Sequence, residues 1–283
     1  MGWQFTGDPE TYAAHAWELL ARAPAERTVA LTILESARAG YRWSDDPMLF
    51  GWYEDGEDVC GAVLWTPPFE LLLAVVPDDS VAQLASALGK RRAALPGVNG
   101  DVATVGRFVD AWRPRRWSAG FEMRLYKLDA LQPPSPPSPG APRVAREEDL
   151  PIAVRWLQAF QADAGVRRTD VQPTARERIA GGRLWLWEIG GVPVSMAART
   201  PTVAGVARIA PVYTPSEHRR RGYGTAITAV CTADALARDA DHVVLFTDLA
   251  NPTSNSIYQQ IGFRPVADYR VVHFDANRAS RRP

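Results

Sequence analysis

Hydrophobic and polar positions along the chain alternate in blocks that switch between helical and strand periods. Residues 9–24 have the apolar spacing of a helix, and residues 48–68 predict two strands joined by a turn at Asp55 and Gly56. The rest of the first half predicts a buried strand at 69–76, helices at 80–95 and 101–112, and a closing strand at 121–129.

The second half repeats this order. A helix is predicted over 147–163 and a hairpin over 183–200, with its turn at Gly190 and Gly191. The following elements are a strand at 205–215, a helix at 223–238, a buried strand at 242–248, a short helix at 253–260 and one or two strands at 262–274. Such alternation predicts an α/β or α+β fold with a mixed sheet. The shared order predicts two copies of one plan.

A proline-rich segment, residues 131–142 (LQPPSPPSPGAP), separates the two halves. Its prolines are too dense for a helix or a central strand and favour an extended, semi-rigid spacer. Because complete sets of helices and strands lie on both sides, we interpret it as a linker between a domain at 1–130 and a domain at 143–283. The alternative is a proline-rich surface loop within one domain.

The composition narrows the class of partner. The 283 residues include 32 Lys and Arg against 32 Asp and Glu, so no net field draws the chain towards a nucleic acid or an anionic membrane. No apolar run approaches membrane-spanning length, and the N-terminus has no signal-peptide pattern. Cys60 and Cys231 lack the spacing of a metal or redox site. We therefore expect a cytoplasmic protein without nucleic-acid, membrane or metal partners.

The sequence between 206 and 238 predicts an anion site. An apolar strand ends at Thr214, three arginines follow at 219–221, and Gly222 and Gly224 lead into a helix. A helix N-terminus presents unpaired amide hydrogens and the positive end of the helix dipole, and glycines let the backbone approach a ligand. The arginine charge favours a diphosphate. On this motif alone, a tight turn with solvated arginines is an equal alternative.

A second motif lies downstream, in residues 247–263 (TDLANPTSNSIYQQIGF). Together the two motifs closely resemble the GCN5-related N-acetyltransferase (GNAT) family. Residues 219–224 match that family's Q/R-x-x-G-x-G/A loop. The family's N-x-x-(A/S)-x-x-x-Y-x-x-x-G-F segment is matched by Asn251, Ser254, Tyr258, Gly262 and Phe263.

The resemblance implies two GNAT-like domains in tandem, each with a mixed, mostly antiparallel sheet flanked by helices. It also implies acetyl-CoA as the cofactor and transfer of its acyl group to the amine of a small molecule by direct attack on the thioester. The residues that it assigns to coenzyme A binding are Val212, Tyr213, Thr214, Arg219, Arg220, Arg221, Gly222, Tyr223, Gly224, Thr225, Asn251, Ser254 and Tyr258.

Acyl transfer needs an acid for the departing thiolate and a donor for the oxyanion. By resemblance Tyr258 is the acid, since a phenol stays protonated at neutral pH; the alternative is a core aromatic. The backbone amide of Val212, or of a neighbour, is the expected oxyanion donor, and Pro211 is expected to mark a bulge in the same strand. Asn251 is expected to contact the pantetheine arm or order the turn, and capping of the next helix is compatible with both.

The general base is the least defined residue. Many family members carry a glutamate on the strand that corresponds to residues 205–213, and this sequence has none there. Asp248 is the first choice. The alternatives are a chain of water molecules or one of the residues Glu188, Glu217, His218 and His273. The missing glutamate also keeps open a second function, an acyl-CoA-binding sensor or scaffold without turnover.

The first half of the chain lacks both motifs. Residues 88–97 are basic but have no matching glycine pattern, and no N-x-x-(A/S)-x-x-x-Y segment precedes residue 118. We therefore expect a degenerate GNAT-like lobe that binds no cofactor. It either mediates dimerisation or shapes the acceptor pocket, with tryptophans at 52, 65, 112 and 117 as candidate lining residues. The chain is accordingly expected to be a monomer or a homodimer.

Overall fold

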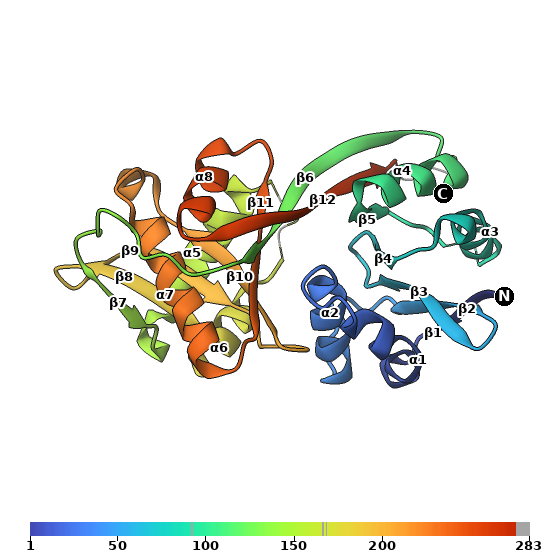
Figure 1. The fold of residues 1–283 in the computed structure, drawn as a ribbon, viewed down its shortest axis with the longest axis horizontal. Helices are drawn as coiled ribbons and strands as arrows, with labels where there is room; N and C mark the ends of the chain where they lie inside the picture. The colour runs from blue at the N-terminus through green and yellow to red at the C-terminus, as the bar shows by residue number, and fades with distance from the viewer. Residues whose placement is uncertain (92, 166, 168, 276–283) are drawn as a thin grey trace, which may run out of the picture. The chain divides into compact units, whose positions relative to one another are not determined.

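The chain forms two compact units (Figure 1). The computed structural model describes residues 1–275 apart from 92, 166 and 168. Of the described residues, the first unit contains 1–125, 248–250 and 267–275, and the second contains 126–247 and 251–266. Each unit therefore includes segments from both halves of the sequence.

Helices and strands follow the same order in both halves. The first half forms β1 (Gly2–Thr6), α1 (Pro9–Ala21), α2 (Thr28–Arg38), β2 (Leu49–Asp55), β3 (Asp58–Trp65), β4 (Leu71–Val75), η1 (Asp78–Ser80), α3 (Val81–Lys90), β5 (Gly97–Asp101), α4 (Val102–Trp112) and β6 (Trp117–Leu128). The second half forms β7 (Ala141–Val144), η2 (Glu147–Asp149), α5 (Leu150–Asp163), α6 (Gln172–Ala180), β8 (Leu184–Ile189), β9 (Val192–Arg199), β10 (Val206–Tyr213), η3 (Ser216–His218), α7 (Tyr223–Arg238), β11 (His242–Asp248), α8 (Pro252–Gln260) and β12 (Phe263–Phe274). The two copies of one plan are confirmed.

Within the described residues, every helix is too short or too polar to cross a membrane.

Some elements were not expected from the apolar pattern. Strands β1, β5 and β7 have only four or five residues each. Helix α6 buries just Ala175 and Ile179, so its apolar stripe is too narrow to stand out. Helix α2 has a clear stripe that includes Leu31 and Leu34, and the sequence prediction overlooked it.

The last strand of each copy lies beside the penultimate strand of the other. Hydrogen-bonded neighbours follow the order β1-β2-β3-β4-β5-β12 in one run of strands and β6-β11-β10-β9-β8-β7 in the other. Strand β12 pairs antiparallel with β5, from Tyr269 opposite Asp101 to His273 opposite Gly97. In each unit one pair, β4–β5 or β10–β11, is parallel. The domain boundaries expected from the sequence stay a prediction. Each compact unit combines segments from both halves of the chain.

Two hydrophobic layers cover the two faces of the second unit's sheet. Successive residues of a strand point to opposite faces. Leu184 and Leu186 of β8 therefore pack with α5 and α6, whereas Trp185 and Trp187 pack on the side of α7. Helix α7 lies against β8, β9 and β10 (Figure 1). This packing fixes the place where α7 starts.

The core of the first unit also combines strands with helices from both sides. Leu84 of α3 and Phe108 of α4 are buried with residues of β4 and β5. Tyr12 of α1 stacks on Phe50 of β2, with ring centroids 5.2 Å apart. Val272 of β12 belongs to the same core as Leu84, so the last strand of the chain is an integral part of the first unit.

The proline-rich segment lies within the second unit and is hydrogen-bonded to the rest of it. The backbone N–H of Gln132 donates to the carbonyl of Ile261 at 3.1 Å. The indole N–H of Trp187 donates to the carbonyl of Pro139 at 2.8 Å. Strand β7 begins directly afterwards, at Ala141, and pairs with β8. The path of the segment is therefore set by specific contacts as well as by its prolines.

Replacing Gly97 by alanine should weaken the pairing of β5 with β12. A Cβ atom at this position would overlap with the carbonyl oxygen of Val272 and lie 3.0 Å from Cγ of Glu70. Overpacking of this kind costs roughly 1–3 kcal/mol of unfolding free energy, which urea denaturation measures.

Gly89→Ala is the matched control in the same unit. Gly89 lies in α3, and no atom outside its own helix comes within 4 Å of its Cβ position. Alanine should therefore raise the unfolding free energy by roughly 0.5–1 kcal/mol. Equal stability of the two variants would contradict the close approach of β5 and β12.

Candidate functional site

Strand β10 leaves its parallel partner β11 half-way along. The paired residues of the two strands end at Ile209 and Leu245, whereas β9 stays paired with β10 as far as Tyr213. The register with β9 shifts next to Val212, which confirms the bulge expected at Pro211. Among the described strands, only β9 therefore pairs with the end of β10.

Hydrogen bonds hold the turn that leads from β10 to α7. The hydroxyl of Ser195, on β9, donates to the carbonyl of Tyr213 at 3.1 Å and lies 2.8 Å from the hydroxyl of Thr214. Nε of Arg219 donates to the carbonyl of Thr214 at 2.9 Å, and a terminal nitrogen donates to Asp163 at 2.5 Å. Because Asp163 is the last residue of α5, Arg219 ties this turn to α5.

Helix α7 starts at a glycine in the left-handed conformation. Gly222 is the N-cap, with φ 80° and ψ −4°. A Cβ atom there would lie 2.5 Å from Oγ of Ser138, so the position favours glycine for two reasons. No side chain of the described residues caps the helix. The amide hydrogens from Tyr223 to Thr225 therefore lack both an intrahelical acceptor and a side-chain cap, and together with the helix dipole they favour an anion.

The three arginines before α7 divide into two kinds. The guanidinium of Arg219 is engaged by Thr214 and Asp163 and lies 5.9 Å from the ring centroid of Tyr213. Arg220 and Arg221 have exposed side chains. Positive charge beside the start of α7 therefore comes from Arg220 and Arg221, while Arg219 acts mainly as a structural tie.

Tyr258 lies on α8 and is partly buried against the core that α7 covers. Its ring stands edge-on to that of Phe263, with centroids 6.3 Å apart and an angle of 67° between the planes. Burial raises the pKa of the Tyr258 phenol to about 12. The group is therefore protonated at neutral pH, as an acid has to be before it donates.

Other residues expected at the site surround the start of α8. Asn251 is exposed directly before the helix, and its carbonyl accepts a hydrogen bond from the N–H of Asn255 at 3.2 Å. Oδ1 of Asp248 accepts a hydrogen bond from the N–H of Ala250 at 2.7 Å, which closes the turn after β11. The side chain of Ser254 lies outside the described part of the structure.

Comparison with known proteins assigns this arrangement to a family. Residues 153–263 match the model described as "Acetyltransferase (GNAT) family". The matched range includes β10, the turn before α7, and α8. The second half of the chain contains a GNAT domain. No curated protein matches the sequence.

Solved structures with the GNAT fold cover nearly the whole chain. A GCN5-related N-acetyltransferase from Kribbella flavida is 19% identical, with 90% of this chain and 97% of that chain covered and a TM-score of 0.60. One from Sphaerobacter thermophilus is 15% identical, with 95% and 94% covered and a TM-score of 0.62. A tandem GNAT protein from the clavulanic acid biosynthesis pathway is 14% identical, with 95% and 97% covered and a TM-score of 0.60. The likeness concerns the fold and confirms two GNAT-like copies in tandem.

The first copy of the GNAT plan differs at the turn before α3, the counterpart of the turn before α7. This turn contains Asp78 and Asp79. Ser80 precedes α3 in the right-handed conformation, where the second copy has the left-handed Gly222. Asp78 forms an ion pair with Arg107 at 2.7 Å. Carboxylates at this place repel a diphosphate, which supports the expectation that the first copy is degenerate.

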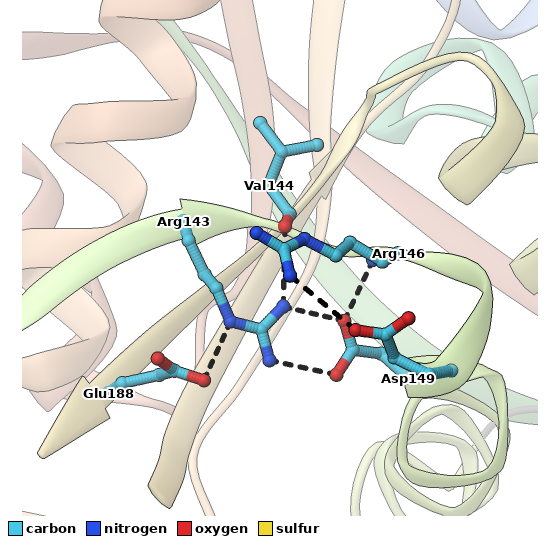
Figure 2. Close-up of polar contacts among 6 residues, drawn as sticks. Arg143, Val144, Arg146, Asp149 and Glu188 are labelled. Atoms are coloured by element: carbon cyan, nitrogen blue, oxygen red, sulfur yellow. Dashed lines mark hydrogen bonds and ion pairs between the residues drawn. The ribbon is translucent and has the colours of Figure 1, made fainter. Parts of the chain in front are cut away.

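Glu188, one of the alternative bases, belongs to an ion-pair network. Nε of Arg143 donates to Glu188 at 2.7 Å, and the terminal nitrogens of Arg143 donate to Asp149 at 2.6 and 2.8 Å. Figure 2 shows Arg143 between these two carboxylates. Its hydrogen bonds hold the pKa of Asp149 below its usual range. The network joins β7, β8 and the start of α5, so Glu188 has a structural role there.

The remaining alternative bases differ in their surroundings. Glu217 is exposed, and hydrogen bonds from its own backbone N–H and from Ser216 lower its pKa. His218 is partly exposed in the same turn. His273 lies 3.0 Å from Glu70 and belongs with it to the first unit.

Two partly buried arginines near the sheet were not expected from the sequence. Arg208 lies on β10, and strand alternation places it on the opposite face from Ala207 and Ile209. Arg178 lies on α6. Burial lowers the pKa of each guanidinium to about 10, and for Arg208 the charge of Arg178 contributes to that shift. For Arg208, the sequence did contain a signal, because it is a charged residue inside the apolar run at 206–213.

Tyr258 should keep its proton until the pH approaches 12. Because the pKa is raised in the folded state, the contribution of this group to stability is complete below about pH 10 and is lost as the pH rises through the folded-state value. The measurement is the phenolate absorbance of the wild-type protein minus that of Tyr258→Phe during alkaline titration. A difference signal with its midpoint near 10 would contradict the burial of this hydroxyl.

Proposed function

We propose that this protein is an acetyl-CoA-dependent N-acyltransferase that transfers an acetyl or other acyl group to the amine of a small molecule. The observation that carries the proposal is that the singly paired end of β10 leads, through one turn, into the uncapped N-terminus of α7. In this proposal the amides from Tyr223 to Thr225, with Arg220 and Arg221, hold the diphosphate. The pantetheine arm extends along β10 beside Val212.

The proposed chemistry assigns one task to each of three residues. The backbone amide of Val212 donates to the thioester oxygen as negative charge develops there. The amine nitrogen bonds to the carbonyl carbon, the carbon–sulfur bond breaks, and Tyr258 donates its phenolic proton to the departing sulfur. Asp248, or a water molecule, accepts the proton that the amine loses.

The absence of a carboxylate from the β10 sequence favours a second candidate, a sensor or scaffold that binds acyl-CoA without turnover. A thiol-release assay with acetyl-CoA and a panel of amines separates the two. Release of coenzyme A that depends on an amine supports the transferase. Binding of acetyl-CoA without release in the presence of any amine supports the sensor, and a failure to bind contradicts both.

Gly222→Ala should weaken acetyl-CoA binding more than Arg220→Ala does. Alanine at position 222 has to adopt a φ of 80° and meets Ser138, so the turn and the amides behind it move. Arg220→Ala removes one exposed charge and leaves those amides in place. Isothermal titration calorimetry compares the two dissociation constants.

Gly190→Ala controls for strain alone. Gly190 also has a positive φ, 55°, but it lies in the turn between β8 and β9 with no atom within 4 Å of its Cβ position. Binding by this variant should equal that of the wild-type protein. A larger loss of affinity in Arg220→Ala than in Gly222→Ala would refute a diphosphate site built from backbone amides.

Tyr258→Phe should bind acetyl-CoA normally and turn over roughly 10²–10⁴-fold more slowly, the range typical of a positioned acid. Phenylalanine keeps the ring packed against Phe263 and removes only the hydroxyl. Calorimetry and steady-state kinetics with an accepted amine measure the two constants. Tyr258→Ala is a poorer test because it also removes packing. Normal turnover in Tyr258→Phe would exclude this residue as the acid.

A further inference from the structure

Three side chains of the second unit form a hydrogen-bonded network under α8. Tyr126, near the end of β6, is fully buried, and its ring belongs to the same core as Phe263. Its hydroxyl donates to Oδ1 of Asn255 at 3.0 Å and accepts from Nε2 of Gln259 at 3.1 Å. Nδ2 of Asn255 donates to the carbonyl of Asn251 at 2.8 Å. The network therefore runs from the core to the residue that precedes α8.

The network holds α8 at two points on one side. Asn255 and Gln259 are four residues apart, so they lie on the same face of the helix, one turn from each other. Helix α8 has 9 residues, fewer than the ~12–15 that an isolated helix needs to be marginally stable. Its orientation therefore depends on tertiary contacts. Tyr258 is adjacent to Gln259, so any rotation of α8 about its axis also moves the phenol.

We propose that Tyr126 is a positioning residue whose hydroxyl fixes the rotation of α8 and thereby aims Tyr258 at the departing sulfur. This inference rests on the proposed acyl transfer. Tyr126 acts through α8 alone, because it is fully buried and its hydroxyl is engaged by two side-chain amides. A strand from the first half of the sequence thus controls the acid of the GNAT domain.

The test compares Tyr126→Phe with Tyr269→Phe. Each variant keeps the ring and loses one hydroxyl; that of Tyr269 donates to the carbonyl of Glu26 at 2.9 Å within the first unit. Tyr126→Phe removes both hydrogen bonds of its hydroxyl, and we expect kcat to fall roughly five- to tenfold while KM for acetyl-CoA stays unchanged. Hydrogen–deuterium exchange of the α8 amides should become faster. Tyr269→Phe should match the wild-type protein in kcat, KM and α8 exchange.

A second variant tests the other end of the network. Asn255→Ala should slow turnover as Tyr126→Phe does, and the double variant should be no slower than the slower single variant, because both changes interrupt one network. Additive losses in the double variant, or wild-type kcat in Tyr126→Phe, would overturn the positioning role. Unchanged exchange of α8 in Tyr126→Phe would overturn the anchor itself.

The two proposals fail in different ways. If the wild-type protein transfers acetyl to none of the amines, the proposed function fails and the positioning of an acid fails with it. The exchange measurement needs no substrate, so it still decides whether Tyr126 anchors α8. If the wild-type protein is active and Tyr126→Phe has the same kcat and KM as Tyr269→Phe, only the positioning role is refuted.

Discussion

The separation of β10 from β11 after Ile209 is the constraint on which the site of the second unit depends. Paired parallel strands satisfy one another's backbone groups along their whole shared length. In β10 the register with β9 shifts beside Pro211, which has no N–H to donate, and the pairing with β11 ends at the preceding residues. The connection from β10 through α7 to β11 starts where this pairing has ended. A strand edge and a helix N-terminus are consequently brought to one end of the sheet, the usual location of ligands in parallel β–α–β units.

This connection is necessary for the proposed site but does not create it alone. The first unit has the same parallel arrangement, β4 followed by α3 and β5. Its turn contains Asp78 and Asp79 and enters the helix through a right-handed Ser80. The turn before α7 instead has exposed arginines and a left-handed Gly222. The difference between the two copies is therefore one of local charge and backbone conformation on a shared scaffold.

Features that a few neighbouring residues impose were predictable from the sequence. Pro211 signalled the bulge in β10 because proline cannot complete a strand ladder, and Gly222 signalled a sharp entry into α7. The pairing of β5 with β12 was not predictable in this way. The residues of this pair, such as Gly97 and His273, are far apart in the sequence. Packing in the first unit, and no local sequence signal, makes β12 the partner of β5. The contact of Tyr126 with α8 escaped prediction for the same reason, since it depends on the neighbour that β6 acquires in the folded chain.

The charges around β10 bear on the missing glutamate. An amine must lose its proton before it attacks a thioester, and Glu188 is held by Arg143. Positive charge and burial both disfavour an ammonium ion and lower its pKa. Strand alternation places Arg208 on the face of β10 opposite to α7, and the charge of Arg178 contributes to lowering its pKa. Positive charge on this face of β10 would therefore favour the free base of any amine bound beside it.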